Sequence, residues 1–413
     1  MTIDLVDAVP VRLGTKGERG RKRLDVGDGF RSERHPILNV VMLITEECNL
    51  RCDYCYIRKQ PRTMSQAIAR RSAGFLFEHA PPPPAALSIT FFGGEPLLEP
   101  GLIELVHAEA TALAAGQDRP VAFSMTSNAT LLSAANVEMI ERLGISVRLS
   151  LDGIGDAHDR HRRTRAGRGS FALIARHLER AAALPSVSVR LTVSPETAVD
   201  LPGSIAWLGE RGFRSISFSP VIEAAWSEDD LAHLYAALGE LHRMQAEWPG
   251  VRIGSLARTG QALESSGERW GCGAARSFVA VDAEGYLYPC HRFVGYFRNG
   301  PGQRVGHVDR GFDVDAREQY IVANHSSSHA GCGHGLFRDD IGAEERRCGN
   351  CSLLSVCGSN CMAVNEYMTG DPTVPPPINR VLAQIEAAAS LQSSGAHGSH
   401  FDPCRTPAVE GDQ

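Results

Sequence analysis

Short apolar runs alternate with longer amphipathic stretches along the chain up to Trp248. Six apolar runs have the length and composition of strands, at residues 38–44, 87–92, 121–126, 145–151, 187–193 and 214–219. Each is followed by a stretch with the length and residue types of a helix, at residues 65–77, 101–115, 133–143, 171–183, 201–211 and 227–245. Six strand–helix repeats predict an α/β fold with a parallel sheet, either open or curved into a partial (β/α)6 barrel of the TIM type.

In both architectures the loops that follow the strands form the ligand-binding face. The segments that could carry chemistry are all in such loops. "TEECNLRCDYCY" follows the first expected strand, "GGEP" the second, "SNATLL" the third and "DGIGDAHDRHR" the fourth. We therefore expect the functional site at the carboxyl ends of these strands.

The repeat ends after Trp248, and the rest of the chain is rich in Cys, Gly and polar residues. Few apolar stretches there are long enough to form an ordinary hydrophobic core, so we expect bound metal to stabilise this region instead. The expected organisation is a flexible segment at residues 1–37, a partial barrel at 38–248 and a Cys-rich domain at 249–413. The tail from about Ser393, rich in Ser, Gly and His, is expected to be mobile.

Composition narrows the cellular setting and the partners. The 413 residues include 11 cysteines, but the N-terminus has no apolar core of signal-peptide length. No apolar run approaches the roughly 20 residues that span a bilayer. A cytoplasmic protein with reduced thiols and no membrane partner is expected. The net charge of −6 argues against a nucleic-acid partner held by phosphate contacts.

Three cysteines stand close together in "CNLRCDYCY". Cys48, Cys52 and Cys55 have the spacing C-x3-C-x2-C, whereas a closed structural zinc site usually needs four Cys or His ligands. Three thiolates on one loop fit a [4Fe–4S] cluster that leaves one iron open. A zinc site or a purely structural cluster is the alternative interpretation.

This spacing, with Tyr54 directly before Cys55, resembles the signature of the radical S-adenosylmethionine (SAM) enzymes. The resemblance implies that the open iron chelates the amino and carboxylate groups of SAM. An electron from the cluster would then cleave a sulfonium C–S bond and yield a 5′-deoxyadenosyl radical. A reducing partner such as flavodoxin or ferredoxin would supply that electron.

The resemblance also implies cofactor contacts. "GGEP", formed by Gly93, Gly94, Glu95 and Pro96, stands where the family contacts the methionine amino group. Ser150 and Arg162 match the positions that hold the SAM carboxylate and ribose in sulfatase-maturing and peptide-maturing members. A guanidinium suits a carboxylate because it binds bidentately. The alternative for "GGEP" is an ordinary glycine turn. The alternative for Arg162 is that it belongs to a basic run, "RHRRTRAGR" at residues 160–168, which is solvated or steers the substrate.

The remaining cysteines resemble the SPASM extension of radical SAM enzymes, which normally houses two auxiliary [4Fe–4S] clusters, making three clusters in all. The matching order assigns Cys272, Cys290 and Cys361 to the first auxiliary cluster, and assigns the second to Cys348, Cys351, Cys357 and Cys404. The fullest family pattern has a further cysteine near Cys272. Its absence leaves an open iron that could take a substrate thiolate, or a site that Cys332 fills. Zinc bound within residues 348–361 is a structural alternative.

His291 bears on the substrate. It follows Cys290 where the sulfatase-maturing relatives have a catalytic aspartate, so the resemblance favours the relatives that cross-link ribosomally synthesised peptides. His291 would act as a base, or else pack as an ordinary histidine. The expected enzyme is a peptide-modifying oxidoreductase that installs an oxidative cross-link, with a thioether favoured. The alternatives are a C–C cross-linking maturase, a maturase that oxidises a sulfatase Cys or Ser to formylglycine, and a non-catalytic iron–sulfur electron carrier.

Overall fold

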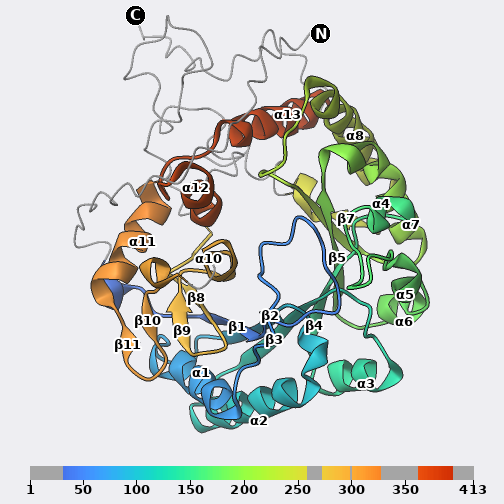
Figure 1. The fold of residues 1–413 in the computed structure, drawn as a ribbon. Coiled ribbons are helices and arrows are strands. Elements are labelled where there is room, and N and C mark those ends of the chain that lie inside the picture. The colour runs from blue at the N-terminus through green and yellow to red at the C-terminus, as the bar shows by residue number, and fades with distance from the viewer. Residues whose placement is uncertain (1–30, 258–271, 298–299, 327–360, 394–413) are drawn as a thin grey trace, which may run out of the picture.

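The computed structural model describes residues 31–257, 272–297, 300–326 and 361–393. The strands form a sheet of eleven with the order β11-β10-β9-β8-β1-β2-β3-β4-β5-β6-β7. Figure 1 shows this sheet curving through the middle of a ring, with helices α1 to α8 outside the parallel strands. The α/β fold that the sequence predicts is confirmed.

The six strands expected from the apolar runs are all present and parallel. They are β1 (Asn39–Thr45), β2 (Leu87–Gly93), β3 (Val121–Ser127), β4 (Ser146–Ser150), β5 (Val187–Val193) and β6 (Ser215–Pro220). Their outward side chains, such as Ile89, Leu149 and Val189, are completely buried. On β2 to β6 most of the alternate side chains are polar and only partly covered, whereas Val41 and Leu43 of β1 are buried. The main core therefore lies between the sheet and the helices, and the inner face is left for a site.

The expected helices also form, with small shifts at their ends. They are α1 (Gln66–Glu78), α2 (Pro100–Gly116), α3 (Ala134–Arg142), α7 (Leu201–Glu210) and α8 (Glu228–Glu247). A short helix that was not expected, α4 (Asp156–Asp159), follows β4. The single helix predicted at 171–183 is wrong in detail. It is two short helices, α5 (Phe171–Ala175) and α6 (Leu178–Ala182), because His177 N donates to Ile174 O in a tighter i−3 turn between them.

The sheet extends beyond the six predicted strands at both edges. β7 (Arg252–Ile253) pairs with β6, and β8 (Phe278–Val281) runs parallel to β1. β9 (Tyr286–Tyr288), β10 (Gly306–His307) and β11 (Gly311–Phe312) follow in antiparallel order. Backbone hydrogen bonds therefore cross the domain boundary expected at residue 248. The boundary itself stays a prediction.

The region after residue 248 also shares the main core, although its sequence suggested little apolar burial. Val281, Leu287 and Phe293 are buried in the same cluster as the barrel strands. Its described residues also form the helices α10 (His291–Tyr296), α11 (Val314–Ser326), α12 (Met362–Thr369) and α13 (Pro377–Ser393). α13 packs along α8, and in Figure 1 it joins the two ends of the ring.

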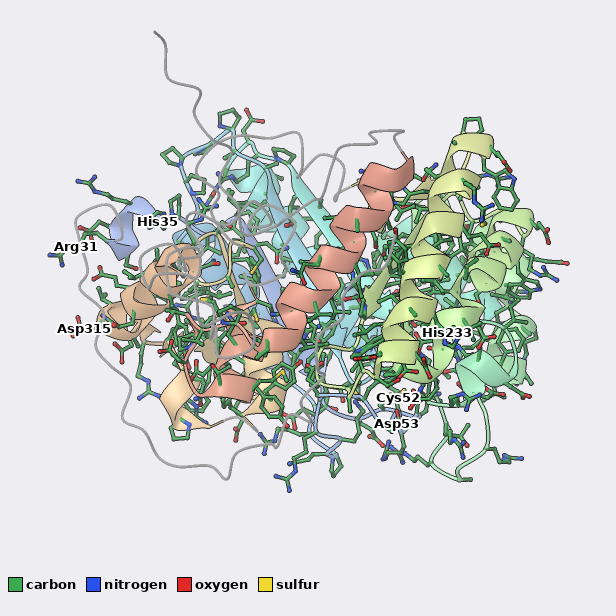
Figure 2. All side chains as sticks on the ribbon, turned by 90° about the horizontal axis from the view of Figure 1, so that it is seen from above. Arg31, His35, Cys52, Asp53, His233 and Asp315 are labelled. Carbon is green, nitrogen blue, oxygen red and sulfur yellow. The ribbon has the colours of Figure 1, made fainter. Side chains whose placement is uncertain are left out.

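Residues 31–37, which the sequence groups with a flexible N-terminal segment, are anchored on α11. Arg317 Nη1 donates to Ser32 Oγ at 2.7 Å, and Ser32 N donates to Glu318 Oε1 at 2.9 Å. In Figure 2, Arg31 and Asp315 lie together at one edge of the molecule, away from Cys52 and Asp53. Residues 1–30 and the tail expected to be mobile lie outside the described residues. Within the described part of the chain, no helix is both long enough and apolar enough to cross a membrane.

Candidate functional site

The three cysteines of the first motif lie on the loop that leaves β1 at the carboxyl edge of the sheet. Cys48 is buried, and Cys52 and Cys55 are half-buried. Burial raises the pKa of the Cys48 thiol, and it raises the pKa of Cys52 to about 11, although Arg162 opposes the second shift. Metal binding at these sulfur atoms must therefore release protons.

Each of the three sulfur atoms has a nitrogen donor nearby. Asn128 Nδ2 lies 3.6 Å from Cys48 Sγ, Arg162 Nη1 lies 4.0 Å from Cys52 Sγ, and Lys59 Nζ lies 2.7 Å from Cys55 Sγ. The backbone N–H of Leu50 also donates to Cys48 Sγ at 3.4 Å. Such donors stabilise anionic sulfur, so these residues fit an iron–sulfur cluster. Lys59 belongs to no motif, and the sequence analysis missed it; Asn128 lies in the "SNATLL" loop, but the sequence analysis assigned it no role.

The two glycines of "GGEP" allow β2 to pass close to the cysteine loop. Gly93 has φ +138°, and a Cβ on Gly94 would lie 2.0 Å from Glu47 O. Gly94 N donates to Thr45 O at 2.8 Å, and Glu95 N donates to Glu47 O at 2.9 Å. Any larger side chain would push the loop that begins at Cys48 away from the sheet.

Glu95 is buried beneath this contact. Its two carboxylate oxygens accept hydrogen bonds from Leu97 N at 3.1 Å, Ser127 Oγ at 2.9 Å and Asn128 N at 2.7 Å. Burial raises the pKa of Glu95 to about 7, against the effect of these donors. The side chain therefore holds the Asn128 turn in place. A direct contact with the amino group of SAM stays a prediction.

The basic stretch at 160–168 packs on the cysteine loop. Arg51 N donates to Arg163 O at 2.6 Å, and Leu50 pairs with Thr164 in an antiparallel bridge. Arg165 Nε donates to Cys48 O at 3.2 Å, and its guanidinium also pairs with Glu47. Arg163, Thr164 and Arg165 therefore support the cysteine loop. The basic composition of the stretch alone did not indicate this role.

Arg162 is close to Cys52, but it is paired within the chain. Its Nε donates to Asp152 Oδ2 at 2.7 Å, and both side chains are nearly inaccessible. Asp152 also accepts from Tyr54 Oη and, at 2.8 Å, from Thr192 N. Asp152 therefore connects the cysteine loop to β5. Ser150 ends β4 and is half-buried; contacts of Ser150 and Arg162 with SAM stay predictions.

The structure brings together the three cysteines expected at the first auxiliary cluster. Cys272 precedes β8, Cys290 precedes α10 and Cys361 precedes α12. Burial, and then the neighbouring Cys361 and Cys272, raise the pKa of Cys290. Cys332 and the second set, Cys348, Cys351, Cys357 and Cys404, lie outside the described residues.

Three His, Cys, Asp or Glu side chains do not converge on a single ion position anywhere in the described ranges. A cluster does not need such convergence, because its cysteines bind separate irons. The fit to a cluster therefore rests on the grouping of the cysteines and on their N–H donors.

α10 links the two cysteine groups. Gly295 lies so close to Tyr56 that a Cβ on it would be 2.6 Å from Tyr56 O. His291, at the start of α10, has its ring 6.1 Å from that of Tyr56 and 4.6 Å from that of Phe92. The residue after Cys55 and the residue after Cys290 thus lie together at the end of β2.

His291 is half-buried, and its Nδ1 atom is buried with no hydrogen-bond partner among the residues that the structure describes. Burial lowers the pKa of His291 to about 3, with further lowering by Arg292, Arg190 and Arg148. The imidazole is therefore neutral at pH 7 and takes up a proton poorly. Its role as a base stays a prediction.

Comparison with known proteins agrees with this arrangement. Residues 42–208 match the family model of the Radical SAM superfamily. An uncharacterized protein of Archaeoglobus fulgidus is 24% identical over 269 residues, which are 61% of this chain and 60% of that protein. The serine-type anaerobic sulfatase-maturating enzyme of Klebsiella pneumoniae is 22% identical over 334 residues, covering 76% of this chain and 79% of that enzyme.

Two solved structures share the fold. The sulfatase-maturating enzyme anSMEcpe with bound SAM superposes with a TM-score of 0.69 at 17% identity, over 87% of this chain and 99% of that one. Streptococcus suis SuiB bound to SAM gives a TM-score of 0.54 at 15% identity, over 83% of this chain and 77% of that one. The cysteine loop after β1, the glycine contact with β2 and the family match agree. Residues 42–208 of this chain therefore form a radical SAM domain.

Proposed function

We propose that this chain is a radical SAM maturase that installs an oxidative cross-link, a thioether, in a ribosomally synthesised peptide. The observation that carries the proposal is the junction of two cysteine groups at the carboxyl edge of one barrel. Tyr56 follows Cys55, His291 follows Cys290, and the two rings lie 6.1 Å apart. A peptide held there would be near both groups.

Cys48, Cys52 and Cys55 would hold the first [4Fe–4S] cluster, and SAM would be held by Gly93, Gly94, Glu95, Pro96, Ser150 and Arg162. With SAM bound, this centre supplies a radical that removes a hydrogen atom from carbon. Other residues of the chain surround this centre. Lys59, Arg162 and Asn128 direct N–H groups at the sulfur atoms, and the half-buried Tyr54 helps to exclude water.

Thioether formation removes two hydrogen atoms from the peptide, one from carbon and one from a thiol. The thiol hydrogen leaves as a proton and an electron, so the site needs an electron acceptor beside the substrate. Cys272, Cys290 and Cys361 would hold the auxiliary cluster that supplies this acceptor. A flavodoxin or ferredoxin would supply the reducing electron to the first cluster.

Peptide binding by structural relatives supports a peptide substrate. Solved structures show anSMEcpe with the Cp18Cys peptide and SuiB with its precursor peptide SuiA. Sulfatase maturation is the second candidate, because anSMEcpe matches this chain over 99% of its own length. The cross-linking proposal is preferred since His291 replaces the aspartate expected of sulfatase maturases.

The test uses the full chain after anaerobic reconstitution with iron and sulfide. Dithionite-reduced protein should cleave SAM to 5′-deoxyadenosine, and a Cys52→Ala variant should not. A cysteine-containing peptide encoded beside the gene should become lighter by two hydrogens, with its thiol no longer alkylated. A free aldehyde in the product would favour sulfatase maturation instead. Loss of two hydrogens with the thiol still reactive would favour a C–C cross-link, and no SAM cleavage would leave the electron-carrier alternative.

A further inference from the structure

The basic stretch at residues 160–168 pairs with the cysteine loop as a short antiparallel ladder. Arg51 N donates to Arg163 O at 2.6 Å, and Asp53 N donates to His161 O at 3.4 Å. Residues directly across such a ladder point to the same side, as do residues two apart along one strand. The side chains of Arg51, Arg163, Asp53 and His161 therefore lie on one side of the loop. His161 Nδ1 lies 2.9 Å from Asp53 Oδ2, in agreement with this register.

The opposite side of the ladder carries the first cysteine group. Cys52 and Arg162 occupy the alternate positions, and Arg162 Nη1 lies 4.0 Å from Cys52 Sγ. Arg162 is buried, whereas Arg51 and Arg163 are exposed in the part of the chain that the structure describes. A single layer of backbone therefore separates the two exposed arginines from a cysteine that would bind the first cluster.

Two further arginines extend the positive side of the ladder. Arg51 Nη1 and Arg165 Nε both donate to Cys48 O, at 2.7 Å and 3.2 Å, so two guanidiniums converge beside one cysteine. Arg160 is exposed, and its carbonyl oxygen accepts from Arg163 Nε at 3.2 Å. We call Arg51, Arg160, Arg163 and Arg165 the arginine patch.

The charge of the arginine patch is only partly balanced by carboxylates. Arg165 pairs with Glu47. Among the described residues, the guanidiniums of Arg51 and Arg163 donate to backbone carbonyl oxygens alone, which carry no net charge. Like charges directly opposite each other on neighbouring strands are destabilising. A bound partner of opposite charge would remove this cost.

The position of the arginine patch indicates which partner binds there. SAM and the substrate must reach the cluster from the side on which the sulfur atoms lie, and the patch lies on the other side. An electron needs no opening in the chain, so a reducing partner can deliver it through the layer of backbone. The chain has a net charge of −6, so an acidic partner is repelled by the molecule as a whole and is oriented by a local positive surface.

We propose that the arginine patch is the docking surface for an acidic electron-carrier protein that reduces the first cluster. The proposal rests on the proposed function in placing a reducible cluster at Cys48, Cys52 and Cys55. In this step one electron passes from the reduced carrier to the oxidised cluster, and no bond forms or breaks. An acidic leader segment of the substrate peptide is the competing ligand for such a surface, and the experiment separates the two.

The rate at which two reductants reduce the first cluster tests the proposal on the full chain after anaerobic reconstitution. One reductant is flavodoxin hydroquinone, an acidic protein, and the other is the methyl viologen radical cation, a small molecule of positive charge. Rapid-freeze electron paramagnetic resonance follows the reduction, and a change of the signal on adding SAM identifies the first cluster. The ratio of the flavodoxin rate to the methyl viologen rate is the quantity that decides, because damage to the cluster affects both rates.

Arg51→Gln combined with Arg163→Gln should lower this ratio about tenfold at low salt, because electrostatic steering contributes tenfold or more to association rates. The effect should disappear near 1 M salt, where charges are screened over about 3 Å. Calorimetric binding of oxidised flavodoxin, which involves no reduction, should weaken at low salt in the same variant.

Arg243→Gln combined with Arg310→Gln is the matched control, because it removes the same charge from exposed positions on α8 and between β10 and β11. Its ratio should be close to that of the parent. Arg160→Glu serves if the double glutamine variant does not bind iron, since Arg160 is exposed at the end of α4. It should also lower the ratio at low salt.

Equal ratios in the patch and control variants overturn the inference, as does a loss that is the same at low and high salt. An unchanged ratio together with weaker binding of the acidic peptide Ac-Glu-Glu-Glu-Glu-NH2 assigns the patch to a leader segment and also overturns it. SAM cleavage with methyl viologen as reductant separates this inference from the proposed function. A chain that cleaves SAM but shows no effect of the arginines refutes only the docking surface, whereas a ratio that depends on the arginines without SAM cleavage refutes only the radical function.

Discussion

Lys59 Nζ lies 2.7 Å from Cys55 Sγ, so its ammonium group places a positive charge beside a sulfur atom of the first cysteine group. A cation at a cluster ligand stabilises the reduced, more negative state of the cluster. Lys59→Met should therefore lower the reduction potential of the first cluster. The expected shift is on the order of tens of millivolts, because only part of the about 1.5–3 kcal/mol that a charge-assisted hydrogen bond contributes differs between the two oxidation states of the cluster.

Redox titration followed by electron paramagnetic resonance checks this shift. Arg58→Met is the control, because Arg58 is exposed on the same loop. An unchanged potential in Lys59→Met with full iron content, or an equal shift in both variants, would show that Lys59 does not act on the cluster.

A second prediction concerns the close approach of β2 to the cysteine loop. Gly94→Ala should destabilise the fold by about 1–3 kcal/mol, because its Cβ would be 2.0 Å from Glu47 O. Iron content should fall as well, since Cys48 directly follows Glu47. Thermal unfolding and iron analysis measure the two effects. Gly101→Ala, at the start of α2, should leave both unchanged or slightly raise the unfolding temperature, because none of the described residues outside its own stretch of helix lies within 4 Å of the new Cβ.

The sequence predicts the barrel well because each strand is a distinct apolar run followed by a helix of ordinary length. β5, at Val187–Val193, has the predicted bounds. The hairpin of β8 and β9 is missed, although "FVAVDAEGYLY" contains a turn signal. Asp282 Oδ1 accepts from Glu284 N and Tyr286 N, and Gly285 has φ +90°. The apolar runs on either side were too short to stand out.

The cysteine positions could also be read from spacing, but the residues around them could not. Lys59, Asn128 and Asp152 are common polar residues whose roles depend on tertiary contacts with the cysteine loop. The open inner face left a weaker signal. "VSVRLTV" alternates apolar and polar residues, whereas a parallel strand covered on both faces is usually apolar throughout. That alternation indicates an open inner face.

The buried pair of Asp152 and Arg162 gives a third prediction. Asp152→Ala leaves the Arg162 guanidinium buried without its carboxylate, which should cost about 3–5 kcal/mol of unfolding free energy. The Tyr54 contact is lost as well, so iron content should fall. Asp53→Ala, one residue from Cys52 but largely exposed, is the control and should have a small effect. Equal stability of the two variants in denaturant unfolding would show that the pair does not hold the loop.

His158 should make the fold sensitive to acid. It is completely buried, with Nδ1 accepting from Asp152 N at 3.3 Å and Nε2 lying 3.0 Å from Ser170 Oγ. Burial, and then Arg162, lower the pKa of His158 to about 4, against 6.5 for an ordinary histidine. The unfolded chain therefore binds more protons between these values, so stability falls as pH drops through 6.5 toward 4. The loss between pH 7 and pH 5 should be about 2 kcal/mol.

His158→Asn removes this titration, so the variant should lose less stability than the parent over the same pH range, whatever its stability at pH 7. Thermal unfolding of both proteins at pH 7 and pH 5 provides the measurement. Parallel losses in the two proteins would mean that His158 is already protonated in the fold or remains accessible to water.

The last prediction separates radical formation from peptide chemistry at His291. Its ring lies beside those of Tyr56 and Phe92, and its Nδ1 atom has no partner in the described part of the chain. His291→Ala should therefore leave SAM cleavage without peptide close to that of the parent. Peptide modification should fall by about 10²–10⁴-fold if the imidazole transfers a proton.

Counting 5′-deoxyadenosine and modified peptide in the same reaction gives the ratio that decides the role of His291. A rise in deoxyadenosine formed per peptide modified would show that radicals form but are not used productively. His291→Asn keeps a polar group of similar size in the enclosed space, so recovery of the ratio in that variant would identify a positioning role. Unchanged peptide modification in both variants would remove His291 from the reaction, because a ring that only packs beside Tyr56 contributes to stability and not to the ratio.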